Sequence, residues 1–458
     1  AVRMDIPREN FFKKEINIVI SRSYGPGRYD HSYEEKGNDY PLSYVRFTEQ
    51  RNMETFLSLL SQKKLDLKNL ITHRFTLDEA ATAYQLIEGK KTEPYLGILL
   101  SYNSKTFDKN SSDLIKINPT KVDNDKIKIS FYGAGNYATA TLIPLMKDSG
   151  KVSFNGLVTS TGMSAQSVAK KFDFSYCASD YKEILNDKND VVAITTRHDT
   201  HSKAICDALA ANKNVYVEKP LALSISELED INKAYTDNAK SQIMVGFNRR
   251  FAPATNEIIQ HFESVKSPLV INIRVNAGFI PADHWTQDAQ EGGGRMIGEG
   301  CHFIDLASAI TKSNVKTIYA VGSSKEEKSA LLNDNLCLSL TFENGSIANI
   351  TYTADGSKAM SKEHIEVFGG GRSAQIKDFK EISLFDGDKK VKDKKLGSQD
   401  KGQKSMIDSW LKGIQNGEPC IDYNSLMQTS LATILSIESL SIGMPLDVDS
   451  KLYKIKSS

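Results

Sequence analysis

The chain has few cysteines, no long apolar run and almost no excess of charge, and each absence excludes a class of protein. Its five cysteines are scattered, odd in number and never spaced as Cys-x-x-Cys, which argues against a disulfide framework and a structural zinc site. No apolar stretch approaches the ~18–20 residues that a membrane span needs, and no apolar signal segment opens the chain. We therefore expect a cytoplasmic protein with no membrane partner.

Charge and histidine spacing exclude two further classes. The 58 basic and 57 acidic residues nearly cancel, so nothing marks a nucleic-acid-binding surface. The basic run at 389–395 follows a turn signal at 386–388, and we interpret it as a solvated hairpin or loop. None of the eight histidines has the His-x-x-x-His spacing of a helical metal site, and we expect no metal.

At 458 residues the chain has room for two to four domains of ~100–200 residues. Residues 1–102 predict a partial α/β segment. Its expected elements are a strand at 16–20, helices at 49–60 and 77–87, and an apolar run at 95–100. Residues 103–125 are rich in Ser, Asn, Asp and Lys and predict a linker. Because the chain opens without Met and in mid-domain, we expect a fragment or a processed product.

From residue 126 the pattern changes to alternating strands and helices. Expected strands are 127–132, 152–158, 191–195, 215–217 and 242–246, with helices between them. This order predicts a doubly wound parallel sheet, a Rossmann domain over 126–246. Residues 247–458 instead show consecutive strands, at 269–275, 315–321, 335–342, 346–353 and 364–368, then helices at 404–415 and 425–440. That order predicts an α+β domain with a large, mostly antiparallel sheet.

A glycine-rich turn joins the first strand of the Rossmann domain to its first helix. Residues 133–138 read Gly-Ala-Gly-Asn-Tyr-Ala, in which Gly133 permits a tight turn and Gly135 lets the backbone approach a pyrophosphate at the helix N-terminus. A merely structural turn is the alternative. The second strand ends in Thr159 and Ser160, where NAD enzymes carry Asp or Glu. That absence removes the repulsion of the extra phosphate of NADP, so we expect NAD(P) with a slight preference for NADP. A plain strand-end turn is the other reading.

A second candidate motif is Glu218-Lys219-Pro220, which ends the strand at 215–217. Ligands of such folds bind beyond the carboxyl ends of the strands. A lysine there can protonate a carbonyl oxygen or deprotonate a hydroxyl, provided that burial and positive charge lower its pKa. The spacing alone also fits a solvated lysine beside a proline.

Taken in order, the motifs of the second half resemble those of the Gfo/Idh/MocA family, named after glucose–fructose oxidoreductase, inositol dehydrogenase and a rhizopine-catabolism protein. They are Gly-x-Gly at 133–135, Thr-Thr-Arg-His-Asp-Thr-His at 195–201, Glu-Lys-Pro at 218–220, Gly-Phe-Asn-Arg-Arg-Phe at 246–251, Gly-Gly-Gly at 292–294 and Gly-Cys-His-Phe-Ile-Asp at 300–305. The likeness covers roughly residues 126 to 447. Family members oxidise or reduce a secondary carbon of sugars, cyclitols or nucleotide sugars.

This resemblance implies roles for individual residues. Lys219 would hold the reacting oxygen, and His302 would be a second acid–base residue, although a helix-capping histidine is the alternative. Arg249 and Trp285 would contact the substrate together with His302; core packing is equally open for Trp285. The expected cofactor-binding residues are Gly133, Gly135, Asn136, Tyr137, Thr159, Ser160, Thr196, Arg197, His201, Glu218, Lys219 and Asn248.

One departure from the family pattern affects the catalytic set. Family members usually carry Asp four residues before the histidine, where this chain has Gly298. Glu299 lies three residues before His302, and i and i+3 share a face of a helix. We therefore expect Glu299 and His302 to form a proton-handling pair in which the carboxylate raises the imidazole pKa. The competing interpretation makes Glu299 an exposed residue at a helix start.

The first hundred residues resemble a different family, the carboxyl-terminal part of a medium-chain, alcohol-dehydrogenase-like protein. The likeness lies in residues 14–16, 21–29 and 72–80. The glycine fingerprint and zinc-ligand region of that family are not in this chain, so the segment is not a complete second active site. The combination resembles bacterial bi-domain oxidoreductases associated with surface-polysaccharide synthesis.

We therefore expect an oxidoreductase acting on a small-molecule sugar or nucleotide sugar. A cofactor-binding interaction or sensing module that has lost catalysis is the alternative, which Gly298 keeps open. A large antiparallel sheet needs cover on both faces, and members of the Gfo/Idh/MocA family commonly pair through that sheet. A homo-oligomer is the resulting expectation.

Overall fold

The computed structural model of the chain divides into two compact units, Ala1–Asn110 and Ser111–Ser458. The residues that it describes are 8–17, 24–35, 37–90, 92–102, 114–118, 125–159, 162–238, 240–323 and 334–448. Within these ranges no helix is both long and apolar enough to cross a lipid bilayer.

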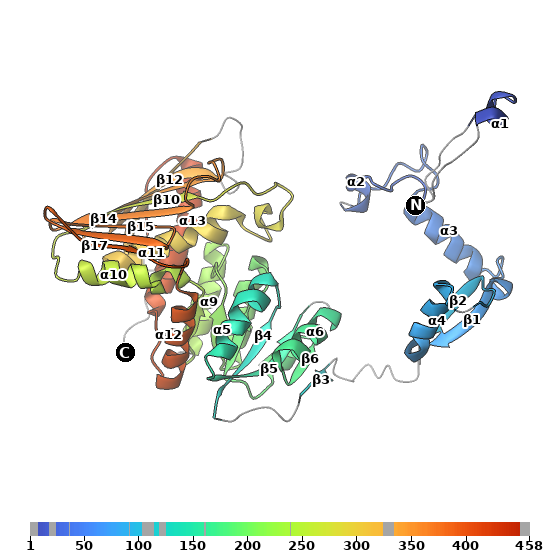
Figure 1. Cartoon of the computed structure of the whole chain (residues 1–458), viewed down its shortest axis with the longest axis horizontal. Coiled ribbons are helices and arrows are strands. Elements are labelled where there is room, and N and C mark those ends of the chain that lie inside the picture. The colour runs from blue at the N-terminus through green and yellow to red at the C-terminus, as the bar shows by residue number, and fades with distance from the viewer. Residues whose placement is uncertain are drawn as a thin grey trace. The chain divides into compact units, whose positions relative to one another are not determined.

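The first unit contains a small strand–helix–strand arrangement (Figure 1). Its elements are α1 (Arg8–Phe12), α2 (His31–Glu34), α3 (Glu49–Ser61), η1 (Lys68–Leu70), β1 (Ile71–Thr76), η2 (Leu77–Glu79), α4 (Ala80–Ile87) and β2 (Gly97–Ser101). β1 and β2 pair in parallel, which requires a crossover such as α4 between them. Both helices expected from the sequence are confirmed, as α3 and as η2 with α4. The strand expected at 16–20 falls partly outside the described residues, and residues 16–17 lie in no strand.

The second unit begins with a seven-stranded sheet in the order β3-β6-β5-β4-β7-β8-β9. The strands are β3 (Ile115–Lys116), β4 (Ile127–Tyr132), β5 (Val152–Val158), β6 (Tyr176–Ala178), β7 (Val191–Ile194), β8 (Asn214–Val217) and β9 (Ile243–Val245). All pairs from β6 to β9 are parallel. A strand such as β7 is buried throughout, because helices cover both faces of a parallel sheet. The expected Rossmann arrangement is confirmed.

The order of the strands in this sheet determines where a ligand can bind. Strand order reverses between β4 and β7, and such a switch point opens a crevice beyond the carboxyl ends of the strands.

At one edge of the sheet, β3 pairs antiparallel with β6. Residues 114–118 therefore belong to the sheet, and the expectation of a linker is wrong for them. Leu114 and Ile117 pack against the core there, and these two apolar residues attach the segment to the sheet.

The second sheet has nine strands in the order β17-β16-β15-β14-β10-β13-β12-β11-β18. They are β10 (Val270–Asn276), β11 (Val315–Gly322), β12 (Asn335–Phe342), β13 (Ile347–Thr353), β14 (Glu363–Gly369), β15 (Arg372–Lys377), β16 (Glu381–Asp386), β17 (Lys389–Lys395) and β18 (Leu446–Asp447). Among the strands that the structure describes in this sheet, only β10 and β13 pair in parallel. The expected mostly antiparallel sheet is confirmed. The basic run forms β17, an exposed strand hairpinned onto β16, as lysine-rich edge strands often are.

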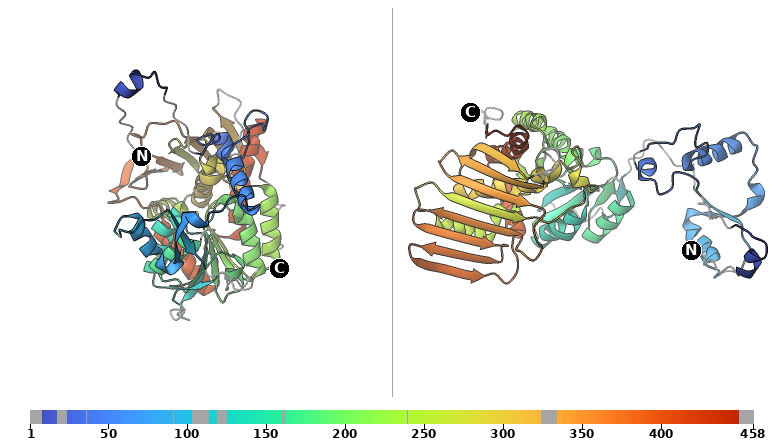
Figure 2. Two further views of the ribbon diagram at one scale, coloured as in Figure 1. Left: turned by 90° about the vertical axis from the view of Figure 1, so that its right-hand side faces the viewer. Right: turned by 90° about the horizontal axis from the view of Figure 1, so that it is seen from above.

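The nine-stranded sheet has one covered and one open face. In β12, Leu336, Leu338 and Leu340 are buried while Cys337 and Ser339 are exposed, the alternation that a half-covered strand requires. Helices α10 (Pro253–His261), α11 (Cys301–Thr311) and α13 (Tyr423–Ile442) lie on the covered side. Figure 2 shows the strands fanned out above them.

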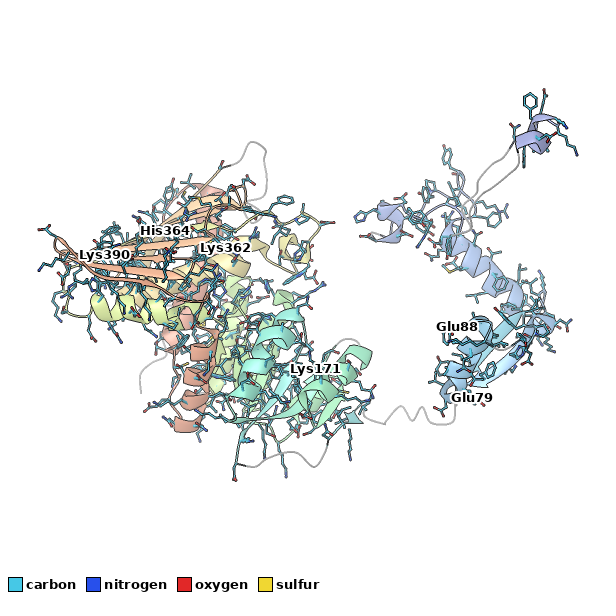
Figure 3. The ribbon with its side chains drawn as sticks, in the orientation of Figure 1. Glu79, Glu88, Lys171, Lys362, His364 and Lys390 are labelled. Carbon is cyan, nitrogen blue, oxygen red and sulfur yellow. The ribbon has the colours of Figure 1, made fainter. Side chains whose placement is uncertain are left out.

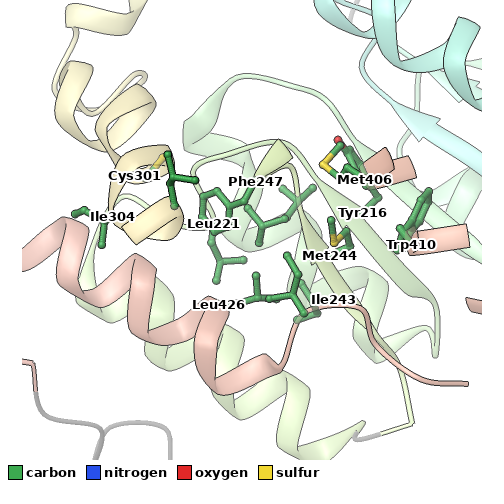
Figure 4. Close-up of a cluster of buried hydrophobic side chains, with 14 of the residues drawn as sticks. Tyr216, Leu221, Ile243, Met244, Phe247, Cys301, Ile304, Met406, Trp410 and Leu426 are labelled. Carbon is green, nitrogen blue, oxygen red and sulfur yellow. The ribbon is translucent and has the colours of Figure 1, made fainter. Parts of the chain in front are cut away.

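The C-terminal helices return to the first sheet and hold the two sheets of the unit together. In α12 (Gln403–Asn416), the ring of Trp410 packs near that of Tyr216, close to the end of β8, with ring centroids 5.1 Å apart. In α13, Tyr423 stacks on Tyr235 of α9 (Ile225–Asp237) with ring centroids 3.7 Å apart. Figure 4 shows Trp410 and Tyr216 within one buried cluster. The packing fixes the sheet domain relative to the end of β8, where the candidate site lies.

Candidate active site

The glycine-rich turn closes the carboxyl end of β4 at the switch point. Gly133 has φ +100°, and a Cβ there would lie 2.7 Å from the backbone of Thr195, which follows β7. Gly135, Asn136 and Tyr137 are exposed, and a Cβ on Gly135 would meet only open space. The helix begins at Asn136, so the first backbone N–H groups after Gly135 have no acceptor within the helix. The turn therefore fits the pyrophosphate of a dinucleotide.

The adenosine end of this site is described only in part. Thr159 follows β5 and is buried. Ser160 lies outside the described residues. The sequence places no carboxylate at either position.

Lys219 lies directly beyond the carboxyl end of β8 and reaches across to the sheet domain. Its Nζ donates a hydrogen bond to the carbonyl oxygen of Gly298 at 2.7 Å. The neighbouring Glu218 accepts a hydrogen bond from the hydroxyl of Tyr216 at 2.7 Å. Burial raises the pKa of Glu218, although the charge of Lys219 opposes the shift. The Tyr137 side chain is 38% exposed, but its hydroxyl end is buried, and this burial together with the charge of Glu218 raises its pKa.

His302 lies in the first turn of α11, immediately after a wide π-helical turn, η8 (Met296–Gly300). Its imidazole is buried, and Nδ1 has no hydrogen-bond partner in the part of the chain that the structure describes. Burial lowers its pKa well below the usual value, and the charges of Arg249 and Lys219 lower it further. His302 is therefore a neutral imidazole close to the Lys219 ammonium, which fits a proton acceptor.

The expected pair of Glu299 with His302 is wrong. The Glu299 carboxylate binds Lys362 at 2.6 Å, Arg295 at 3.0 Å and the Tyr352 hydroxyl at 2.6 Å, and among the described residues no hydrogen bond joins it to His302. Burial would raise the Glu299 pKa, but these partners, Lys362 foremost, hold it below its ordinary value. The π-helical turn explains the error, because its extra residue breaks the i, i+3 alignment of an α-helix.

Arg249 and Asn248 also differ from expectation. Arg249 donates from Nε and Nη2 to the two carboxylate oxygens of Glu363, each at 2.9 Å, and is 6% exposed. Asn248 donates from Nδ2 to the carbonyl oxygen of Lys401 at 2.8 Å. Because these groups are committed to internal partners, Arg249 and Asn248 hold the start of the sheet domain in place. We expected a substrate contact and a cofactor contact, respectively.

The loop after β7 positions the strand end that carries Lys219. His201 is fully buried, and its Nδ1 donates to the carbonyl oxygen of Pro220 at 2.7 Å. Burial lowers the pKa of His201 to about 4. Thr196 shares a 2.5 Å hydrogen bond with Thr200. Both expected cofactor residues, His201 and Thr196, therefore have internal partners that shape the loop.

A segment of the sheet domain packs against this loop. Arg197 forms an ion pair with Glu291 and lies 5.5 Å from the Trp285 ring centre. Trp285 in turn lies edge-on to His198, with ring centroids 4.8 Å apart. Trp285 thus lies beside the candidate site, and it is half-buried.

Several residues of this centre were not singled out from the sequence. Lys362 precedes β14 (Figure 3) and binds Glu299. Lys401 binds Glu363 at 2.6 Å. Nothing in the sequence around either lysine distinguishes it from an ordinary solvated lysine. His198 had one: it lies within the 195–201 motif, three residues before His201.

The two domains of the second unit match one protein family. Residues 127–247 match the Gfo/Idh/MocA oxidoreductase family, NAD-binding Rossmann fold. Residues 267–374 match the Gfo/Idh/MocA C-terminal domain.

Individual relatives match at modest identity. The uncharacterized oxidoreductase YrbE of Bacillus subtilis is 26% identical over 303 residues, which are 62% of this chain and 86% of that protein. Inositol 2-dehydrogenase of Salmonella typhimurium is 33% identical over 144 residues, 31% of this chain and only 41% of that protein.

Solved structures share the fold of the second unit. An oxidoreductase domain protein from Kribbella flavida superposes with a TM-score of 0.63 at 18% identity, covering 71% of this chain and 99% of that one. A levoglucosan dehydrogenase in complex with NADH and levoglucosan gives 0.63 at 18% identity, over 70% and 99%.

Proposed function

Because the chain carries both domains of the Gfo/Idh/MocA family and belongs to it as an NAD-binding oxidoreductase, we propose that it transfers hydride between NAD(P) and a secondary carbon of a cyclitol, sugar or nucleotide sugar. This proposal rests on one contact beyond the carboxyl end of β8: Lys219 donates a hydrogen bond to the carbonyl oxygen of Gly298, four residues before His302. Its relatives include inositol 2-dehydrogenases of Salmonella typhimurium and Thermotoga maritima. The resemblance of residues 1–102 to part of a bi-domain oxidoreductase favours nucleotide sugars within this class.

The residues present fit a dinucleotide and divide the chemistry between them. Gly133, Gly135 and Tyr137 would hold the cofactor, which supplies the hydride acceptor when bound. Lys219 donates a hydrogen bond to the substrate oxygen and stabilises negative charge that develops on it. His302, whose imidazole burial keeps neutral, accepts the hydroxyl proton. As the carbon loses hydride and the oxygen loses its proton, the secondary alcohol becomes a ketone.

The test is turnover over a panel of polyols with both cofactors. We expect reduction of NAD⁺ or NADP⁺ on at least one of myo-inositol, levoglucosan or a set of nucleotide sugars. We also expect NADPH to bind at least as tightly as NADH, because no carboxylate at 159–160 repels the extra phosphate. Nicotinamide fluorescence at one ionic strength measures both affinities. Binding of either cofactor without turnover on any compound would contradict the proposal, and a tenfold preference for NADH would contradict the cofactor argument.

We also propose that the chain self-associates through the open face of its nine-stranded sheet. Cys337, Ser339, Thr341 and Ile347 are exposed on that face, and a second layer packed against it would cover the sheet on both sides. Sedimentation at micromolar concentration should return a species heavier than the 50.8 kDa monomer. Introducing Ser339→Arg should shift it toward the monomer, whereas Lys390→Glu on the edge strand β17 serves as the control. A wild-type protein that sediments only as monomer would refute this.

A further inference from the structure

His198 occupies the space in which any side chain at position 298 would begin. A Cβ built on Gly298 would lie 2.9 Å from Cε1 of His198, which is closer than side-chain carbons approach. The carbonyl oxygen of Gly298 accepts the hydrogen bond from Lys219. His198 and Lys219 therefore contact the same residue from two sides.

The ring of His198 is fixed in one orientation. Its Nδ1 lies 2.7 Å from the carbonyl oxygen of Gly292, and a carbonyl can only accept, so Nδ1 carries the hydrogen and Nε2 carries the free lone pair. Burial lowers the pKa of His198 to about 3, and the charge of Lys219 contributes to the shift. The imidazole is thus neutral at physiological pH. In the described part of the chain Nε2 makes no hydrogen bond.

We propose that His198 is a substrate-contacting residue whose Nε2 accepts a hydrogen bond from a hydroxyl adjacent to the reacting one. This inference rests on the proposed function and narrows it to substrates with a vicinal diol. A fixed, neutral acceptor near Lys219 suits a hydroxyl, which donates one hydrogen bond. It also accounts for Gly298, where family members usually have Asp: the acceptor comes from the loop after β7 instead of from η8.

A purely structural role would use the other nitrogen, so two variants separate the roles. His198→Asn keeps an N–H near the Nδ1 position for the Gly292 carbonyl but does not extend to the Nε2 position. His198→Gln places an amide oxygen near Nε2 and gives up the bond to Gly292. We expect Asn to raise KM for the polyol roughly 3- to 10-fold, the effect of losing one neutral hydrogen bond, and Gln to raise it less. The opposite order, with Asn like the wild type, would overturn the inference.

A second comparison moves the acceptor back to position 298. Gly298→Asp in the His198→Ala background has the space that the imidazole vacates, so the double variant should turn over polyol faster than His198→Ala alone. Thermal unfolding of each variant shows whether it is folded. A folded double variant that is no faster than folded His198→Ala would count against the inference.

Binding without turnover distinguishes this inference from the proposed function. The Nε2 ¹⁵N resonance of His198, assigned from its loss in His198→Gln, should shift when myo-inositol or levoglucosan is added to the protein with NAD⁺. A shift in a protein that oxidises no compound of the whole panel, nucleotide sugars included, would leave the inference standing and the proposed function refuted. Turnover without a shift, and with no effect of His198→Asn, would refute the inference and leave the proposed function standing. No shift with any polyol that we add, and no turnover, would overturn both.

Discussion

Replacing Lys219 by alanine should lower turnover about 10²- to 10³-fold, the usual effect of removing a preorganised hydrogen-bond donor at a developing negative charge, while the affinity for NADH changes little. Lys219 Nζ donates to the Gly298 carbonyl and lies near His302, so its loss removes the hydrogen-bond donor expected at the substrate oxygen. The turn around Gly133 does not depend on it, which is why cofactor binding should survive. Stopped-flow turnover and NADH fluorescence measure the two effects.

The matched control for Lys219 lies at the other end of the same strand. Lys213 precedes β8 and donates to the carbonyl oxygens of Asp187 and Asn189 at 2.5 and 3.1 Å. It lies beyond the amino end of the strand, away from the crevice, so Lys213→Ala should retain turnover in the fraction that is folded. Wild-type turnover in Lys219→Ala, or an equal loss in both variants, would remove Lys219 from the catalytic set.

Replacing Glu363 by alanine should destabilise the protein by about 3–5 kcal/mol, the typical effect of breaking a buried ion pair. Glu363 has no exposed surface and binds both Arg249 and Lys401. Burial would raise the Glu363 pKa, but these two cations outweigh it and hold the pKa below its ordinary value. Without the carboxylate, Arg249 remains buried with an uncompensated charge. Urea unfolding, with the midpoint and slope fitted together, measures the loss.

An exposed ion pair provides the comparison for Glu363. Lys404 and Asp408 pair at 2.5 Å on the solvent side of α12, with side chains 71% and 43% exposed. Asp408→Ala should change the free energy of unfolding by about 0.2–1 kcal/mol, as exposed pairs do. If Glu363→Ala cost no more than Asp408→Ala, the buried pair would contribute little and Arg249 would be free for another role.

Local sequence determined the longer elements and the glycine-rich turn of the site. A strand such as β12 alternates buried and exposed side chains, and a strand such as β7 is apolar throughout, so short-range periodicity was sufficient to place both. The same holds for the turn at Gly133, because the need for positive φ and close backbone approach restricts that position to glycine. Local pattern also placed Lys219 at a strand end, but its assignment to the site came from the resemblance to the Gfo/Idh/MocA family, because the spacing alone also fits a solvated lysine.

Only the tertiary structure decided which charged groups meet. Glu299 and His302 are three residues apart, yet their roles differ. The π-helical turn lies before His302, and Lys362 before β14 and Tyr352 on β13 bind the Glu299 carboxylate. Arg249 reaches Glu363 more than a hundred positions away. Glycine at 298 had no explanation within its own segment. The fold explains it, because His198 occupies the space that a side chain at position 298 would need. Steric exclusion and ion pairing depend on distances in space, so they leave no local pattern in the sequence.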